Sequence, residues 1–169
     1  MSIFLLCSCG MKLSAKDEAI RYLNKYKYLD AEIMKELDEN VDNEDFTDEQ
    51  KKQYKDILTK QYSDMRFDVV NEEYVDDQAI ITVKVVVYDL YKVQEDANDY
   101  LNSHQDEFMT DGEYDKNLFL NYKLDKMEEQ KDTIDYEINI ELEKDDKGNW
   151  VVQQLSDEDL EKLHGIYEG

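Results

Sequence analysis

Residues 79–90 read AIITVKVVVYDL, and this stretch has the strongest β-propensity in the chain. Its apolar side chains recur at every second position, namely Ile81, Val83, Val85 and Val87. β-Branched residues at a period of two are typical of a strand with one covered face. The stretch therefore predicts a central strand, around which the other elements are arranged. Val86 interrupts the polar side of the strand, which predicts that this side is partly covered as well.

Two hairpins are expected from the alternating segments around this strand. Residues 65–75 also alternate, and the Asp-Asp pair at 76–77 provides a turn into the central strand. Further on, residues 134–142 alternate between apolar and charged side chains, as in a strand with one exposed face. A turn with Gly148 and a return strand over 150–155 complete the second hairpin.

Helical periodicity accounts for most of the remaining sequence. Capping boxes that begin at Ser14, Thr47 and Ser156 predict three helix starts, and Asp30 is expected to cap a shorter helix before an acidic loop over 38–46. Apolar stripes between the hairpins predict a helical insert, on residues Ala97, Tyr100, Leu101, His104, Phe108, Leu120, Leu124 and Met127. The expected fold is α+β, with a curved antiparallel sheet of about four strands wrapped around the N-terminal helices.

Composition restricts the function classes. The chain has 169 residues and a net charge of −23, yet 41% of its residues are hydrophobic and 13 are Tyr, which favours a folded domain over disorder. Nucleic-acid binding is not expected, because no basic stripe is available to neutralise phosphates. The same charge opposes direct adhesion to anionic lipid headgroups. We expect no cofactor.

The N-terminal residues MSIFLLCSCG provide a prediction of location. Residues 6–10, LCSCG, resemble the lipobox of bacterial lipoproteins. The resemblance implies that a dedicated peptidase cuts between Ser8 and Cys9, and that Cys9 then carries a diacylglyceryl group. Cys7 would leave with the leader. The domain organisation would then be a signal remnant over 1–8, a tether over 9–13 and one domain over 14–169.

The lipobox resemblance places the protein on the outer face of the cytoplasmic membrane of a Gram-positive bacterium, held by its lipid. The apolar core of the leader is short, and no Lys or Arg precedes it, so we expect an additional start codon upstream. The alternative is a cytoplasmic chain with an apolar N-terminal segment.

Three stretches extend the resemblance to the fold. They are AKDEAIRYLNKYKYLDAE at 15–32, the central hairpin, and GNWVVQQLSDEDLEKL at 148–163. Together with the lipobox, they resemble small Gram-positive lipoproteins of the nuclear-transport-factor-2-like fold. The resemblance implies a cone-shaped domain with a curved sheet around its helices. Because that fold hosts isomerases, dehydratases, enzyme subunits and binding modules, it leaves the function open.

Few residues are candidates for a catalytic role. Enzymes of the resembled fold commonly use an Asp–His or Asp–Tyr pair inside the cone. Asp89 has the inward parity of the central strand, and His104 lies on the stripe of the insert, so either is a candidate acid or base. His164 is expected near a frayed terminus, where it favours the helix dipole. A cone-mouth pocket has four tyrosine candidates, Tyr22, Tyr26, Tyr88 and Tyr91.

Because the acid–base candidates lie on separate elements, we expect a non-catalytic binding or accessory module for a small ligand, a peptide or an envelope protein. A small pocket hydrolase or isomerase is the alternative.

Calcium binding is a further alternative. Oxygen ligands stand at positions 1, 3, 5 and 12 of an EF-hand-like pattern, on residues Asp38, Asn40, Asp42 and Glu49. Asn43 replaces the usual glycine, and Asp45 replaces the usual aliphatic residue. Spacings of this kind also arise by chance among 43 acidic residues, so no metal site is assigned. A second near match fails at Tyr100 and lies in a helical pattern, on residues Asp96, Asn98 and Glu107.

Overall fold

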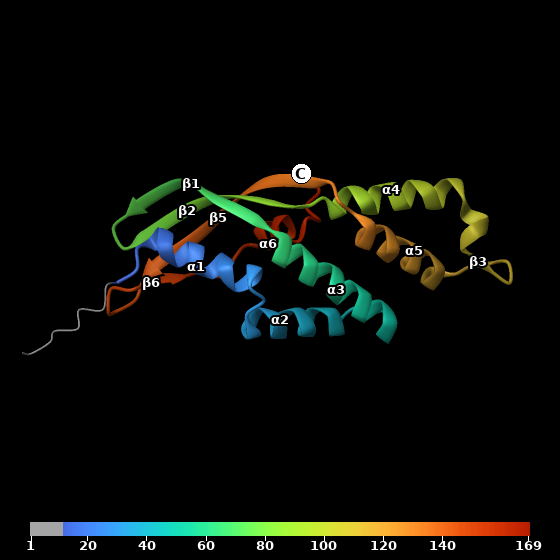
Figure 1. The fold of residues 1–169 in the computed structure, drawn as a ribbon, viewed down its shortest axis with the longest axis horizontal. Helices are drawn as coiled ribbons and strands as arrows, with labels where there is room; N and C mark the ends of the chain where they lie inside the picture. Colours follow the sequence, from blue (N-terminus) through green and yellow to red (C-terminus); the bar gives the residue numbers. More distant parts are fainter. Residues whose placement is uncertain (1–11) are drawn as a thin grey trace, which may run out of the picture.

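A computed structural model describes residues 12–169 of the chain. The signal remnant, the lipobox and Cys9 therefore lie outside the described residues. The fold is α+β (Figure 1). Its elements in order are α1 (Ala15–Lys27), α2 (Ala31–Asp42), α3 (Asp48–Asp64), β1 (Arg66–Val75), β2 (Gln78–Tyr88), α4 (Leu90–Ser103), the 3-10 helix η1 (Gln105–Phe108), β3 (Met109–Thr110), β4 (Glu113–Tyr114), α5 (Lys116–Glu129), β5 (Thr133–Lys144), β6 (Trp150–Val152) and α6 (Asp157–His164).

The main sheet has the strand order β1-β2-β5-β6, with every pair antiparallel. The two predicted hairpins are confirmed, and the pairing of β2 with β5 joins them into one open sheet. In this register Val83 of β2 lies between Val69 of β1 and Ile138 of β5. The stretch that the sequence marks as central is therefore a central strand. A separate small hairpin, β3–β4, was not predicted.

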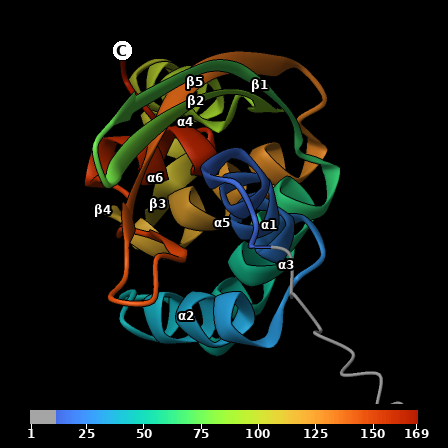
Figure 2. The same cartoon turned by 90° about the vertical axis from the view of Figure 1, so that its left-hand side faces the viewer.

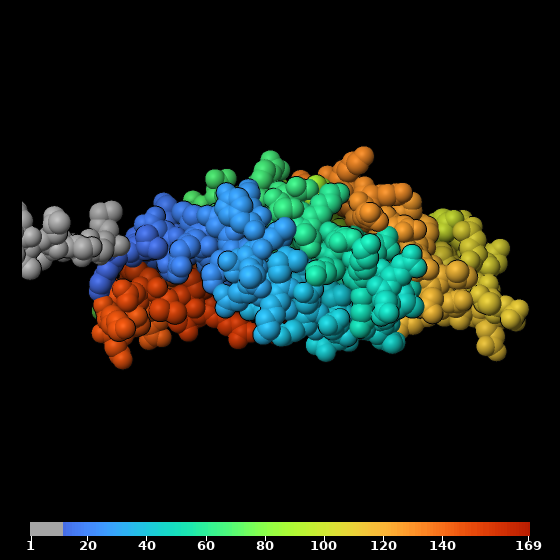
Figure 3. All heavy atoms as spheres, turned by 60° about the horizontal axis from the view of Figure 1, so that its bottom comes forward, coloured from blue at the N-terminus to red at the C-terminus, as the bar shows by residue number. Residues whose placement is uncertain are grey.

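Helices α1, α2, α3 and α6 lie on one side of the main sheet, which arches over α1 and α6 (Figure 2). Odd-numbered side chains of β2 point toward these helices, and Ile81, Val83 and Val85 are fully buried. They pack in one core with Leu23 of α1 and Leu58 of α3. Seen from the helical side, the first three helices form a continuous surface (Figure 3). On the opposite side of the sheet Val86 is half-buried, as expected for a partly covered side chain, although no helix of residues 12–169 packs on that side.

The helical insert forms an arm, which we define as residues 90–129. It extends from the end of the sheet along the long axis of the molecule (Figure 1). A second, smaller core joins the arm to α3, through Ile57 of α3 with Leu90, Val93, Leu120, Leu124 and Met127. The predicted insert between the hairpins is thus confirmed, with its own apolar core.

Helix starts follow the predicted caps. Both reciprocal contacts of a capping box are present at Ser14 and Thr47, and the Ser156 side chain accepts a hydrogen bond from the Asp159 N–H. Some boundaries differ from prediction. Helix α2 continues to Asp42, because Val41 is buried on the same stripe as the preceding turns. Strand β6 ends at Val152, three residues earlier than expected.

No helix of residues 12–169 is both long enough and apolar enough to cross a bilayer.

Candidate functional site

The two catalytic candidates, Asp89 and His104, lie at opposite ends of α4. Asp89 is the N-cap, and its carboxylate accepts a hydrogen bond of 3.0 Å from the Lys92 N–H. His104 ends the helix, with its ring stacked on Tyr100 at a centroid distance of 4.0 Å. A helix of 14 residues is about 21 Å long, so these groups do not form an acid–base pair. His104 also lies beyond the end of the predicted stripe, because its backbone leaves the helical conformation.

His164 corrects a second prediction, since it is packed against α3 and not frayed. Its Nε2 lies 2.7 Å from the hydroxyl oxygen of Tyr62. Burial lowers the pKa of His164 to about 4, so the ring is neutral and does not act as a cation on the helix dipole. Gly165 ends α6 with a φ of 73°, and a Cβ there would meet the carbonyl oxygen of Tyr88. This close approach holds the end of α6 in place.

The four tyrosine candidates do not share a pocket. Tyr22 and Tyr26 are neighbours on α1, with hydroxyl oxygens 3.3 Å apart, and burial raises the pKa of both. The Tyr88 hydroxyl donates to a carboxylate oxygen of Asp64, and Tyr91 lies on α4. Core side chains fill the concave side of the sheet where the expected pocket would open.

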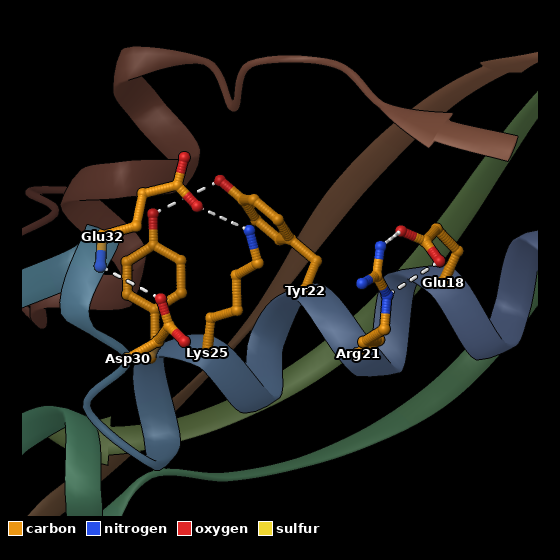
Figure 4. A network of polar contacts seen from close by, with 7 residues as sticks. Glu18, Arg21, Tyr22, Lys25, Asp30 and Glu32 are labelled. Carbon is orange, nitrogen blue, oxygen red and sulfur yellow. Dashed lines mark hydrogen bonds and ion pairs between the residues drawn. The ribbon is translucent and has the colours of Figure 1, made fainter. Parts of the chain in front are cut away.

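A polar network fixes the corner between α1 and α2 (Figure 4). Lys25 donates a 2.7 Å hydrogen bond to Glu32, which raises the pKa of the Lys25 amine. The Asp30 carboxylate accepts from the Glu32 N–H at 3.0 Å and so caps α2. One turn earlier, Arg21 pairs with the buried carboxylate of Glu18. Each side chain of the network has its partner within it, which indicates a structural role.

The EF-hand-like residues do not form a loop. Asp38, Asn40 and Asp42 lie on α2, and Glu49 lies in the first turn of α3. Asp38 pairs with Lys55. Within residues 12–169 no group of three or more His, Cys, Asp or Glu side chains is arranged to hold a metal ion. The predicted calcium loop is therefore wrong, because α2 continues into its first five positions, 38–42. The second near match lies on α4 and η1, at Asp96, Asn98 and Glu107.

The outer face of the main sheet is open to solvent, and the strand register arranges its side chains in rows. One row is Glu73, Ile80 and Glu141, and the next is Val75, Gln78 and Glu143. The face is acidic, since its carboxylates are Asp68, Glu73, Asp135, Glu137, Glu141 and Glu143, and its cations are Arg66 and Lys84.

A hollow of about 460 Å³ opens on this face beside the β1–β2 turn. Exposed apolar side chains lie in it, with Val75 68% and Ile80 39% exposed. Its rim carboxylates are Glu73, Glu141 and Glu143. A concavity of this size is within the range of small-ligand sites, and it combines an apolar floor with unmatched negative charge.

The lysines of β2 and β5 do not neutralise this rim. Lys84 pairs with Asp135 at 2.9 Å, and Lys144 pairs with Asp77 at the same distance. Among residues 12–169, the rim carboxylates have no Lys or Arg partner within 4 Å. The hollow therefore keeps its negative charge.

A second concavity, of about 450 Å³, lies between α4 and α5. Its floor is apolar and aromatic, formed by Val93, Ala97, Tyr100 and Tyr122. The two rim lysines are already paired along their own helices, Lys92 with Asp96 at 3.3 Å and Lys126 with Glu129 at 2.9 Å. This groove is consequently less charged than the hollow on the sheet.

Sequence reasoning missed the residues of the hollow, although a signal for them was present. Ile80 and Val86 occupy even positions of a strand whose other even positions are polar or amphipathic. These two residues on the exposed parity mark apolar positions on the outer face of the sheet, and Ile80 lines the hollow.

Comparison with known proteins adds a distant structural likeness. No protein-family model matches the sequence, and no curated protein matches it as a relative. Among solved structures, the chain is similar to a "putative lipoprotein (ycdA)" from Bacillus subtilis subsp. subtilis str. 168, at 10% sequence identity and a TM-score of 0.46. The similarity covers 80% of this chain and 45% of that chain, so this chain matches less than half of the other protein's length.

Proposed function

We propose that this protein is a lipid-anchored, non-catalytic binding or accessory module of the cell envelope, which holds its partner on the open face of the main sheet. The proposal rests on the difference between the two faces of the main sheet. One face is filled by helices, and the other offers an apolar-floored, acidic hollow. Surfaces that combine exposed apolar side chains with a polar rim are typical of binding sites.

The positions of Asp89 and His104 support binding over catalysis. General acid–base catalysis needs titratable groups within hydrogen-bond reach of the reacting atoms. Here Asp89 caps α4 and His104 stacks on Tyr100 at its other end. A pocket hydrolase or isomerase would have to use one of them alone.

Anchoring is supported by the sequence around Cys9 and by the position of Lys12. Lys12 contacts the Lys147 carbonyl oxygen in the β5–β6 turn, at the end of the molecule opposite β3 (Figure 1). Cys9 is three positions before Lys12, a reach of at most about 11 Å. A lipid on Cys9 would therefore hold this end near the membrane and direct the arm away from it.

Anchoring is tested by expressing the chain behind a complete lipoprotein leader in a Gram-positive host. We expect mass spectrometry to find a diacylglyceryl group on Cys9 as the new N-terminus. Cys9→Ala should release the protein from the membrane fraction, whereas the matched control Cys7→Ala should leave it anchored. An unmodified Met1 or Met11 at the mature N-terminus would contradict anchoring.

Binding is tested by a thermal-shift screen of the Cys9→Ala chain against envelope metabolites and peptides. A ligand present at a hundred times its Kd stabilises the folded state by about 2.7 kcal/mol. We expect the stabilisation to disappear when Ile80→Asp disrupts the hollow. Turnover of a screened compound that is lost in Asp89→Asn or His104→Ala would replace the binding proposal with the enzyme alternative.

A further inference from the structure

We propose that the open face of the main sheet binds a basic polypeptide segment of a partner protein. Its Lys or Arg heads would pair with Glu73, Glu141 and Glu143, and its apolar parts would rest on Val75 and Ile80. The inference names the partner class of the binding module and therefore rests on the proposed function.

Charge is the first argument. Among residues 12–169 the rim carboxylates have no Lys or Arg partner, although Glu73 accepts a hydrogen bond of 2.8 Å from the Asn71 amide, and the lysines of β2 and β5 are engaged with Asp135 and Asp77. The whole chain has a net charge of −23, so its field attracts cationic partners and accelerates their association. The same field repels nucleic acids and anionic lipid surfaces. A cationic guest thus complements both the hollow and the molecule.

The spacing of the carboxylates favours several cationic groups over a single metal ion. Glu73 and Glu141 lie on either side of Ile80 in one row, so their backbones are about 10 Å apart across three strands. Ligands of a calcium ion must converge to about 2.5 Å from it. Glu141 and Glu143 are two positions apart on β5, or about 6.7 Å. That distance equals the repeat of same-side residues in an extended peptide.

The floor of the hollow favours long amphipathic side chains. Val75, Ile80 and the neighbouring Val151 of β6 are 68%, 39% and 44% exposed. Lys and Arg bury their aliphatic stems on apolar surface while their charged heads stay at the rim. An extended segment with Lys or Arg at every second position therefore places its charged heads at the rim and their aliphatic stems on the floor.

The test uses the full chain with Cys9→Ala and a dye-labelled octapeptide of alternating Lys and Val, followed by fluorescence polarisation. The control peptide has Glu in place of Lys. The rim variant combines Glu73→Gln, Glu141→Gln and Glu143→Gln. The matched control, with the same change in net charge on exposed glutamates elsewhere, combines Glu44→Gln, Glu113→Gln and Glu161→Gln.

We expect the Lys peptide to bind and the Glu peptide not to bind. The rim variant should weaken binding about ten-fold or more, and the matched control by less than about two-fold. Ile80→Ser should weaken binding about five-fold through loss of apolar contact. Equal losses in the rim variant and its control would show unspecific attraction to a polyanion and would overturn the inference.

Two further outcomes separate this inference from the proposed function. Binding of phosphatidylethanolamine–phosphatidylcholine vesicles, without binding of the Lys peptide, would overturn the inference in favour of an amine-bearing lipid surface. If no Lys peptide binds but a different compound from the thermal-shift screen stabilises the chain in an Ile80-dependent manner, the binding module stands and the basic segment is wrong. If neither binds, both proposals fail.

Discussion

Gln61 is a polar side chain at the junction of three elements, and it is only 1% exposed. Its amide nitrogen donates to the carbonyl oxygens of Tyr88 and His164, at 3.0 and 2.7 Å. Its amide oxygen accepts from the Tyr88 N–H at 2.9 Å. One residue of α3 thereby fixes both the end of β2 and the end of α6.

Replacing Gln61 with Met should reduce the free energy of unfolding by about 2–4 kcal/mol, because three buried backbone groups lose their partner while the side-chain volume is kept. Urea denaturation measures the change. The matched control is Gln53→Met on the same helix, where the amide contacts only the exposed carboxylates of Asp125 and Glu128. A Gln61 variant as stable as that control would refute the assigned role.

His164 should make the folded state sensitive to acid. Its folded pKa of about 4 lies below the usual 6.5, so the unfolded chain binds the proton more readily. The neutral ring therefore makes its full contribution to the free energy of unfolding above about pH 6.5. This contribution, about 3 kcal/mol in total, is lost as the pH falls toward about 4.

The pH effect is measured by following the free energy of unfolding of the native chain and of His164→Gln between these pH values. The difference in free energy of unfolding between the native chain and His164→Gln should become smaller on acidification, because only the native chain carries the imidazole of His164. A constant difference between native chain and His164→Gln would contradict the burial of this ring.

At the scale of elements, the two cores predict unequal protection from hydrogen exchange. The amides of β2 over 81–87 are paired on both sides and fully buried on one face, so they should exchange most slowly. The arm is attached through the smaller core and should exchange by local opening. Mass spectrometry of deuterated peptides measures both. Equal protection of the arm and β2 would indicate one cooperative unit.

Truncation inside the arm should act locally. Leu124 is 1% exposed in the smaller core, and Leu124→Ala should cost the arm about 2–5 kcal/mol. Exchange should accelerate over 90–129 and stay unchanged in β2. Leu118→Ala, on the same helix but 40% exposed, provides the control and should have little effect.

The strands and helix starts could be predicted from the sequence where a local pattern alone determines them. Alternation on 79–90 gave the central strand, and Ser14 and Thr47 gave two helix starts, because pattern and caps are local. Prediction failed where tertiary contacts decide. Burial of Val41 extends α2 to Asp42, into the first part of the proposed calcium loop. The hollow was equally hidden, since cross-strand rows depend on the pairing of β2 with β5, which no local pattern specifies.

At the scale of the whole molecule, the net charge has the largest effect on how stability depends on salt. A net charge of −23 produces self-repulsion in the compact state, so screening should stabilise it. Raising NaCl from about 0.02 M to about 0.5 M should increase the thermal midpoint by a few degrees. The increase should be smaller for the combined variant Glu44→Gln, Glu113→Gln and Glu161→Gln. A midpoint that falls or stays constant with salt would contradict this prediction.

The arm also has a consequence for engineering, which follows from how it leaves the sheet. Tyr88 and Thr133 are paired residues of β2 and β5, and the Asp89 N–H bonds to the Asp132 carbonyl oxygen at 3.0 Å. The whole arm therefore departs and returns at adjacent points, as a long loop of an ordinary hairpin would. Such a site tolerates exchange of its insert, because the free-energy cost of closing a loop rises only slowly with the number of residues in the loop. A two-residue turn or a foreign domain grafted here should preserve the strand pairing, provided that Ile57 of α3, which removal of the arm would uncover, is made polar.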